Sequence, residues 1–307
     1  MGLRIKTNMA ALRAQRNLAS STKSLESSSQ KLASGKKINR SADDAAGLAI
    51  ATNLGADFRS LGQARRNAND GISLIQTAEG GLAETTAMLV RLRELAIQSA
   101  SDTVSNTERA YIDKEFVGLK DEIDRIAAST EFNGTRLLVG EAKLPDEIAN
   151  EPGTFPLEIQ VGKDYVSSVD GPDEDNPVNL IRIDLGQINA FTDGDGSLEI
   201  GRGEDGIRAT SRESAQNSIT KVDFAINRVS EYRSYLGAMQ NRLQSTVNNL
   251  GVQVENIAAA KSQIEDTDFA EETAKFTATQ IIQQAGSSVL SQANQIPNIA
   301  ISLVNNL

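Results

Sequence analysis

The apolar residues of this chain recur at helical spacing over most of its length. From position 219 to position 264 they fall on three- and four-residue steps, interrupted at Arg233, Gln240 and Lys261. A stripe of roughly 50 residues predicts a helix roughly 75 Å long at about 1.5 Å per residue. A second stripe covers 61–96 and a shorter one covers 112–126, before a two-residue hairpin turn at Asn133-Gly134. Each stripe needs a partner to cover it, so the three stripes predict one bundle of long helices.

The middle of the chain has a different pattern. Five of the six prolines and ten of the 23 glycines lie between positions 140 and 206, which confines long helices to the flanks. Apolar and polar residues alternate over 155–161 and 180–185, with Leu198 and Ile200 as a shorter third piece, so we expect strands there. This segment holds 16 acidic and four basic residues, and we expect a small acidic, β-rich module at the surface.

Both ends of the chain carry a weak apolar seam. No charged residue follows Lys275, yet the apolar runs there are far shorter than the roughly 18 residues of a membrane span. On a helix, one face of this segment collects Ala278, Ile282, Ala285, Val289, Gln292, Ile296, Ile299 and Leu303. Near the start of the chain, one coiled-coil register collects Ala11, Ala14, Leu18, Ser21, Leu25, Ser28 and Leu32.

These two seams have two interpretations. They can be ordinary core helices of one globular domain, or a pair of helices that is fully covered only by neighbouring molecules. Terminal segments usually fray unless something holds them, and the uncharged outer face of the last helix is unlike a solvated surface. We therefore predict that the terminal helices pair as a coiled coil and complete their burial by assembly.

The composition excludes most kinds of catalytic group and metal site. The chain has no cysteine and no histidine, which excludes disulfides, thiolate catalysis, imidazole bases and most transition-metal sites. The acids lie mostly on predicted helix exteriors or in turns, so we expect no enzyme, no cofactor and no metal centre. The first residues lead into a polar helix without an apolar core segment, so we expect no cleaved signal peptide.

Charge is unevenly distributed. Residues 1–40 hold nine basic side chains and one acid, whereas the whole chain has a net charge of −10. The basic residues have no aromatic residues interleaved among them, which is unlike a nucleic-acid surface. We therefore expect no nucleic-acid binding, and the short apolar runs after Lys275 predict no membrane insertion.

Two motifs imitate ligand sites. The glycines at 201, 203 and 206 fit a dinucleotide-binding pattern, but Glu204 and Asp205 would oppose a pyrophosphate and no repeated βαβ unit surrounds them. The acids from Asp193 to Glu204 have spacing similar to a calcium loop, but Leu198 occupies the place of the essential glycine. We interpret both as turns.

Several motifs resemble bacterial flagellin. The N-terminal ones are QRNL at 15–18, LASGKKIN at 32–39, ADDAAGLAI at 42–50, NDGISLIQTAE at 69–79 and RELA at 93–96. The later ones are FNG at 132–134, LGAMQNRL at 236–243, DTDFAE at 266–271 and QANQIP at 292–297. The resemblance covers roughly 1–140 and 205–307, and the short middle segment departs from larger family members.

The resemblance implies a mainly α protein that polymerises into the flagellar filament for swimming. The terminal helices, 1–40 and 270–307, would form an inner coiled-coil domain with its linker. Residues 41–140 and 206–269 would form a helical rod with a β-hairpin, and 141–205 a short outer module. The alternative is the hook-filament junction protein, which shares the terminal pattern but whose relatives lack several of the central motifs. Abundance in sheared filaments separates the two.

The resemblance also implies sites and partners. The subunit interface of the terminal helices would include Leu18, Leu25, Leu32, Ile282, Val289, Ile296 and Leu303. A second surface, made by Arg91, Leu95, Gln98 and Glu115, is similar to the patch recognised by the vertebrate Toll-like receptor for flagellin, and the same residues can serve contacts between protofilaments. Further implied partners are an export chaperone at the C-terminal helix and the junction and cap proteins at the filament ends. The implied location is extracellular, after export without a cleaved signal peptide.

Overall fold

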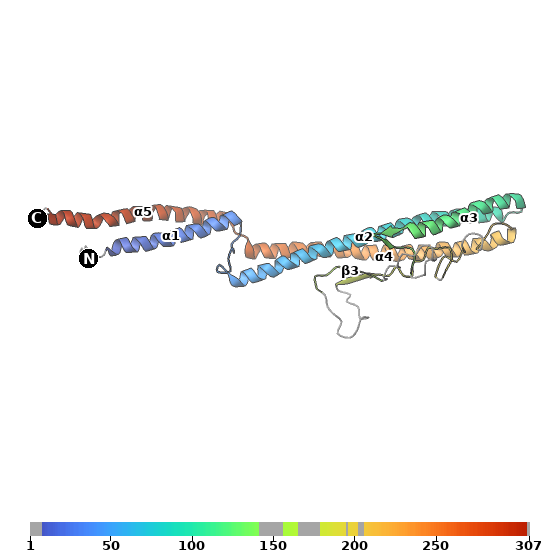
Figure 1. The fold of residues 1–307 in the computed structure, drawn as a ribbon, viewed down its shortest axis with the longest axis horizontal. Helices are drawn as coiled ribbons and strands as arrows, with labels where there is room; N and C mark the ends of the chain where they lie inside the picture. Colours follow the sequence, from blue (N-terminus) through green and yellow to red (C-terminus); the bar gives the residue numbers. More distant parts are fainter. Residues whose placement is uncertain (1–7, 141–155, 165–178, 195, 202–205, 306–307) are drawn as a thin grey trace, which may run out of the picture. The chain divides into compact units, whose positions relative to one another are not determined.

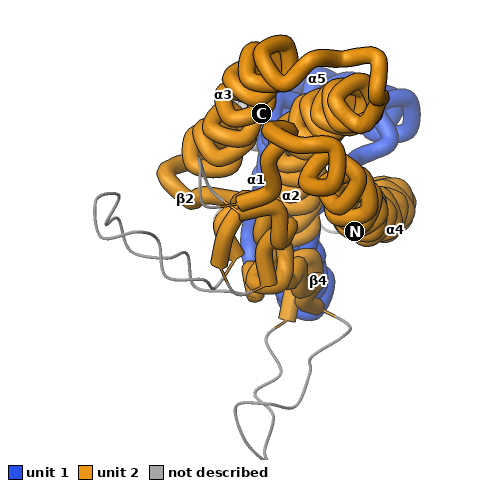
Figure 2. The backbone as a smooth tube through the Cα atoms, turned by 90° about the vertical axis from the view of Figure 1, so that its right-hand side faces the viewer, with its two compact units in different colours: residues 1–58, 255–307 blue, residues 59–254 orange. Residues whose placement is uncertain are grey.

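The computed structural model describes residues 8–140, 156–164, 179–194, 196–201 and 206–305, with the backbone alone described for 296–305. The chain divides into two compact units, coloured separately in Figure 2. Unit 1 comprises residues 1–58 and 255–307, and unit 2 comprises residues 59–254. The fold is mainly α with small β elements, as the sequence predicts.

Long helices account for most of the described chain (Figure 1). The helices α2, α3 and α4 cover the three apolar stripes, which confirms those predictions. The helices are α1 (Met9–Ser34), α2 (Ala45–Ser99), α3 (Asn106–Ser129), α4 (Arg212–Glu265) and α5 (Phe269–Asn305).

Side chains cap the helix ends. The Asn8 side chain accepts a hydrogen bond from the amide of Ala11 at the start of α1, and Gly35 ends that helix with a φ of 71°. At the start of α3, Ser105 and Glu108 form a reciprocal capping box. At the start of α5, the Asp268 carboxylate accepts from two backbone amides. Local sequence therefore fixes where these helices begin.

The turn after α3 forms as predicted. Strands β1 (Glu131–Phe132) and β2 (Thr135–Arg136) pair antiparallel around Asn133 and Gly134. Both turn residues have positive φ, 52° and 80° respectively. Asparagine and glycine tolerate this conformation, which is why this dipeptide predicts a tight hairpin.

A second hairpin joins two of the predicted strands, and the third is absent. Strand β3 (Leu157–Gln160) pairs antiparallel with β4 (Leu180–Ile183). The strand expected at Leu198 and Ile200 is wrong, because Glu199 between them has a φ of 57°, which an extended strand cannot accommodate. Their side chains are nevertheless buried. Residues 141–155, 165–178, 195 and 202–205 of the predicted acidic module lie outside the described residues.

Unit 2 has one apolar core to which three helices contribute. Every member of the predicted 61–96 stripe is buried, and the long α4 stripe supplies fully buried residues as well. The hairpin β3–β4 and the segment before α4 add further aliphatic side chains to the same core. Representative core residues are Leu82, Leu89, Leu92, Phe116, Ile123, Val222, Val229, Leu236, Ile183 and Leu185.

Candidate functional site

The terminal helices α1 and α5 lie along one another in unit 1 (Figure 1). The side-chain amide of Asn8 donates to the carbonyl of Ala293 at 2.7 Å. Further along, the amide of Gln283 donates to the hydroxyl of Thr22 at 3.2 Å. The low residue numbers of α1 thus meet the high numbers of α5, so the two helices run antiparallel.

The face of α1 that meets α5 is the one the sequence predicts. Every position of this register is sheltered along α1, and Ala14 and Ser28 are its buried members. Small side chains at those positions allow the helix backbones to approach closely. The less exposed positions are Ala11, Ala14, Leu18, Ser21, Leu25, Ser28 and Leu32, among others.

The face of α5 that meets α1 differs from the apolar face singled out in the sequence. A side chain added at Gly286 would lie 3.4 Å from the Leu18 methyl, so Gly286 belongs to the contact. Its sheltered neighbours, at alternating steps of four and three, are Glu272, Phe276, Thr279, Gln283, Leu290 and Ala293. The two seams singled out in the sequence, one on each terminal helix, therefore do not face one another. The glycine and alanine face permits closer approach than branched side chains do.

The members of the predicted α5 stripe whose side chains are described are left without cover in this chain. Ile282 and Val289 are 58% and 55% exposed, and Ile281, which adjoins the stripe, is 61% exposed. The side chains of Ile296 and Leu303 lie outside those that the structure describes. A contiguous aliphatic face of this kind is typical of a surface that meets another molecule. Its role as a subunit interface, together with that of the α1 seam, stays a prediction.

A polar junction ties the linker after α1 to the end of α4 within unit 1. The Lys36 ammonium lies 2.5 Å from the Glu265 carboxylate, and the amide of Lys37 donates to the Glu265 carbonyl at 2.7 Å. The amide of Thr267 returns a bond to the carbonyl of Gly35. The Lys36 hydrogen bond lowers the pKa of Glu265, and the same bond raises the pKa of Lys36. These contacts lie where α1 ends and where α5 is about to begin.

The residues of the predicted receptor patch are only partly on the surface. Arg91 lies 2.8 Å from Glu115 and 3.0 Å from Glu94, which makes an exposed three-residue ion network between α2 and α3. Gln98 is exposed, but Leu95 is only 2% exposed and packs in the core. The structure therefore brings Arg91 and Glu115 together. It also places Glu94 beside them, a residue that the sequence analysis did not single out. Recognition of this patch stays a prediction.

Buried charges on α3 hold the segment that leads back into α4. The Asp124 carboxylate accepts from the amide and hydroxyl of Thr192 at 2.8 and 2.9 Å. The Asp113 carboxylate accepts from Arg208 and from the amide of Ala209. The Lys120 ammonium donates to the carbonyl of Ile207, and burial lowers its pKa despite the nearby Asp113. Side chains here satisfy backbone groups that a sheet would otherwise pair.

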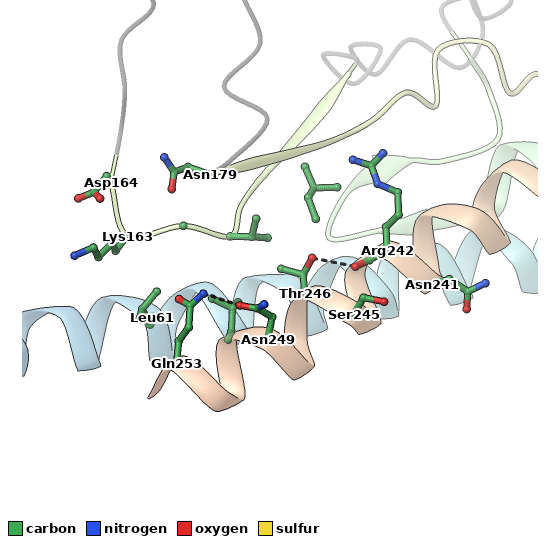
Figure 3. Close-up of a pocket in the computed structure, with 14 residues that line it drawn as sticks. Leu61, Lys163, Asp164, Asn179, Asn241, Arg242, Ser245, Thr246, Asn249 and Gln253 are labelled. Atoms are coloured by element: carbon green, nitrogen blue, oxygen red, sulfur yellow. Dashed lines mark hydrogen bonds between the residues drawn. The ribbon is translucent and has the colours of Figure 1, made fainter. Parts of the chain in front are cut away.

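A cleft of about 780 Å³ opens between α4 and the β3–β4 hairpin in unit 2 (Figure 3). Its floor is apolar and its walls carry amides, hydroxyls and three charged side chains. Sequence reasoning missed this site, although the polar residues at four-residue spacing on α4 were visible as a signal. The floor consists of Leu61, Val161, Ile181 and Leu250. The walls carry Asn241, Arg242, Ser245, Thr246, Asn249, Gln253, Lys163, Asp164 and Asn179.

Ligand-binding chemistry is otherwise sparse. In the parts of the chain that are described, no three acidic side chains gather closely enough to hold a metal ion. The acidic loop at 193–204 and the glycine pattern at 201–206 each include residues outside the description. None of the described helices combines the length and apolar character that a membrane crossing requires.

Comparison with known proteins identifies the family. A model of the bacterial flagellin N-terminal helical region matches residues 5–143, and one of the C-terminal helical region matches residues 219–304. This chain belongs to the bacterial flagellin family. The motifs that indicated it lie in the matched regions, on or beside α1, α2, α4 and α5 and in the β1–β2 hairpin.

Full-length relatives agree with this membership. Polar flagellin C of Vibrio parahaemolyticus is 38% identical, with 99% of this chain and 100% of the relative covered. A flagellin of Halalkalibacterium halodurans is 39% identical, with 98% and 99% covered. Flagellins are structural proteins of the flagellar filament, so this flagellin is a structural subunit and not an enzyme.

One solved structure shows a related fold. A flagellar hook-associated protein of Vibrio parahaemolyticus superposes with a TM-score of 0.54 at 12% identity, over 73% of this flagellin and 100% of that chain. That likeness concerns the fold alone. Bacillus cereus flagellin is 32% identical over 64% of this chain and 94% of its own, with a TM-score of 0.46.

Proposed function

We propose that this flagellin polymerises through its terminal helices into the extracellular filament that drives swimming. The observation that supports this proposal is the uncovered stripe of α5. Ile281, Ile282 and Val289 stay more than half exposed although α5 already has a partner in α1. Covering an aliphatic side chain fully is worth about 1.5–3 kcal/mol, so a neighbour that covers these three contributes a few kcal/mol per subunit. Such a contact joins two different surfaces of neighbouring copies. If its repetition does not close into a ring, it builds a helical polymer.

The proposed organisation follows the family pattern. Residues 1–40 and 270–307 form the inner layer, 41–140 and 206–269 the helical rod, and 141–205 the outer module. The seam residues Leu18, Leu25 and Leu32 hold α1 on α5, while Ile282, Val289, Ile296 and Leu303 face neighbouring subunits. The subunit leaves the cell without a cleaved signal peptide and becomes ordered at the growing tip.

The proposed partners act at defined surfaces. An export chaperone covers the uncharged part of the C-terminal helix, after Lys275, before secretion, because an aliphatic stripe in a single copy promotes aggregation. Junction and cap proteins meet the ends of the filament. A host Toll-like receptor engages the exposed part of the patch, namely Arg91, Gln98 and Glu115, with Leu95 supporting it from the core.

Polymerisation of the purified chain tests the proposal. We expect filaments in electron micrographs from the full chain, and none from a chain that lacks residues 276–307. Circular dichroism of the shortened chain should still report helix, because α2, α3 and α4 lie outside the deletion. Filaments of normal length from the shortened chain would contradict the proposal.

The junction protein is the second candidate, and the structural likeness to a hook-associated protein is the observation in its favour. Near-complete coverage by flagellins at 36–39% identity supports the filament role instead. Quantifying the chain in sheared filaments separates the two. A filament subunit forms the major band, whereas a junction protein is a trace component.

A further inference from the structure

The cleft over α4 has a wall that differs from an ordinary solvated helix face. Between Arg242 and Glu255, α4 carries no charged residue, although many of its side chains there are exposed. Val252, beside the cleft wall in the sequence, is 59% exposed. Exposed faces of long helices normally carry lysine and glutamate in alternation. An uncharged, hydrogen-bonding face of this length is typical of a surface that contacts protein.

The polar groups of this wall have a regular spacing. Asn241, Ser245, Asn249 and Gln253 follow one another at four-residue intervals, and Figure 3 shows them along one side of α4. Steps of four residues advance about 6 Å along a helix, close to the roughly 6.6 Å between alternate residues of an extended chain. The wall therefore offers amide and hydroxyl groups in near register with the backbone of an extended segment laid along it.

Several of these groups retain hydrogen-bonding capacity. The side-chain amide of Gln253 donates to the side-chain oxygen of Asn249 at 2.6 Å, and the side-chain nitrogen of Asn249 and the side-chain oxygen of Gln253 take no part in that bond. Asn241 and Ser245 are exposed. Below them the apolar floor, with Leu61 and Leu250 nearly buried, gives an incoming segment a dry surface for its side chains.

The charged side chains of the cleft indicate which kind of molecule can bind there. The cleft carries Arg242 and Lys163 against the single acid Asp164, in a chain whose net charge is −10. Within the described part of the chain, no carboxylate forms an ion pair with Arg242. Two copies of an acidic chain repel one another where both surfaces carry carboxylates. A surface that is poor in acids, such as this cleft, is therefore the easier place for a second copy to approach.

We propose that this cleft is a contact surface for a second copy of the chain, which lays an extended, acidic segment along α4 in the polymer. The inference rests on the proposed function, since it requires that copies assemble. It adds a specific site in unit 2 to the contacts of the terminal helices. The backbone of the incoming segment pairs with the polar side chains spaced at four residues on α4, which sets the register of the contact. Arg242 favours an acidic segment at this surface.

A single introduced thiol tests this contact directly. The chain has no cysteine, so Ser245→Cys carries one reactive group, at a position exposed in the single copy. We expect a maleimide to label it rapidly in dilute monomer and about tenfold or more slowly in filaments. Ser230→Cys, also exposed on α4 and outside the cleft, reports the labelling rate of an open helical site. Equal labelling of Ser245→Cys in monomer and filament overturns the inference, as does protection already present in the monomer.

A pair of neighbouring substitutions tests its effect on assembly. Asn249→Asp places an acid in the cleft, whereas Asn248→Asp places the same acid one residue away, outside the lining. We expect the first to raise the critical concentration for polymerisation about tenfold and the second to change it little. Circular dichroism confirms that both variants are folded. Equal critical concentrations for the two variants overturn the inference, while failure of the unaltered chain to polymerise overturns the proposed function instead.

Discussion

At the scale of single residues, three charged side chains of α3 in this flagellin bind backbone groups of another segment. Asp113, Lys120 and Asp124 project from α3 and bind amides or a carbonyl of the segment that returns to α4. Neither the hydrophobic pattern nor the motifs indicate this role. In the sequence, each of the three residues looks like an ordinary charged residue on the polar face of a helix. Only packing at the return segment makes them necessary, because buried backbone groups need partners.

Removal of the Asp124 carboxylate tests this role. Asp124→Ala leaves the buried amide and hydroxyl of Thr192 without this acceptor, so we expect the free energy of unfolding to fall by about 2–3 kcal/mol. Asp121→Ala, an exposed acid on the same helix, should change it by less than about 0.5 kcal/mol. Urea unfolding measures both. A similar small effect from the two variants would show that the carboxylate is not needed there.

The ion pair at the linker predicts a dependence on pH. Glu265 has a lowered pKa when folded, so its contribution is complete above its ordinary value of 4.5 and is lost as the pH falls through the folded value. Lys36 has a raised pKa, so its contribution is complete below 10.5 and is lost as the pH rises through the folded value. Because half of the Lys36 side chain is exposed, we expect Glu265→Gln to lower stability by about 1 kcal/mol or less at neutral pH.

Thermal unfolding at neutral and at acidic pH checks this expectation. The difference between the unaltered chain and Glu265→Gln should shrink as the carboxylate becomes protonated. Glu255→Gln, an exposed position on the same helix, controls for the loss of a charge. A difference that stays constant down to strongly acidic pH would mean that the Lys36 contact does not stabilise the fold.

At the scale of elements, α5 has two faces with different tasks. One packs on α1 through small or polar residues such as Gly286 and Gln283, and the other exposes Ile282 and Val289. Sequence periodicity identifies the more apolar face but cannot show which face a given neighbour takes. In this structure the face with small residues packs against α1, because small side chains allow the two helices to approach closely.

The exposed face can be altered without disturbing the contact with α1. We expect the double variant Ile282→Ser, Val289→Ser to keep its helical circular dichroism and to raise the critical concentration for polymerisation by more than about tenfold, because it removes burial worth at least 1.4 kcal/mol. Gln284→Ser, on an exposed polar position of α5, is the control. Sedimentation of polymer at graded concentrations gives the values. Unchanged polymerisation of the double variant would exclude this face from the interface.

At the scale of the whole molecule, net charge opposes assembly. Each copy carries −10, so neighbouring copies repel one another over a distance that salt controls. The screening length is about 30 Å at 0.01 M salt and about 10 Å at 0.1 M. We expect the critical concentration to fall as salt rises over this range, measured by light scattering. A rise with salt would indicate that attractive ion pairs dominate the interface.

The sequence by itself determined the elements of this flagellin and its family. The 3.6-residue spacing of aliphatic residues required long helices, Asn133-Gly134 required a tight turn, and motifs spread along the chain identified the family. These features depend on residues near one another in the chain. The predicted strand at Leu198 failed because buried side chains alone cannot distinguish a strand from a turn, and the φ of Glu199 decided it.

Tertiary structure alone decided which surfaces meet. The face of α5 against α1, the cleft between α4 and the β3–β4 hairpin, and the position of Leu95 inside the core all depend on residues far apart in the sequence. Helical periodicity fixes the direction of a side chain around its own axis but carries no information on the neighbour that the side chain meets. Contact between helices depends on size and hydrogen bonding at both surfaces, which only their packing brings together.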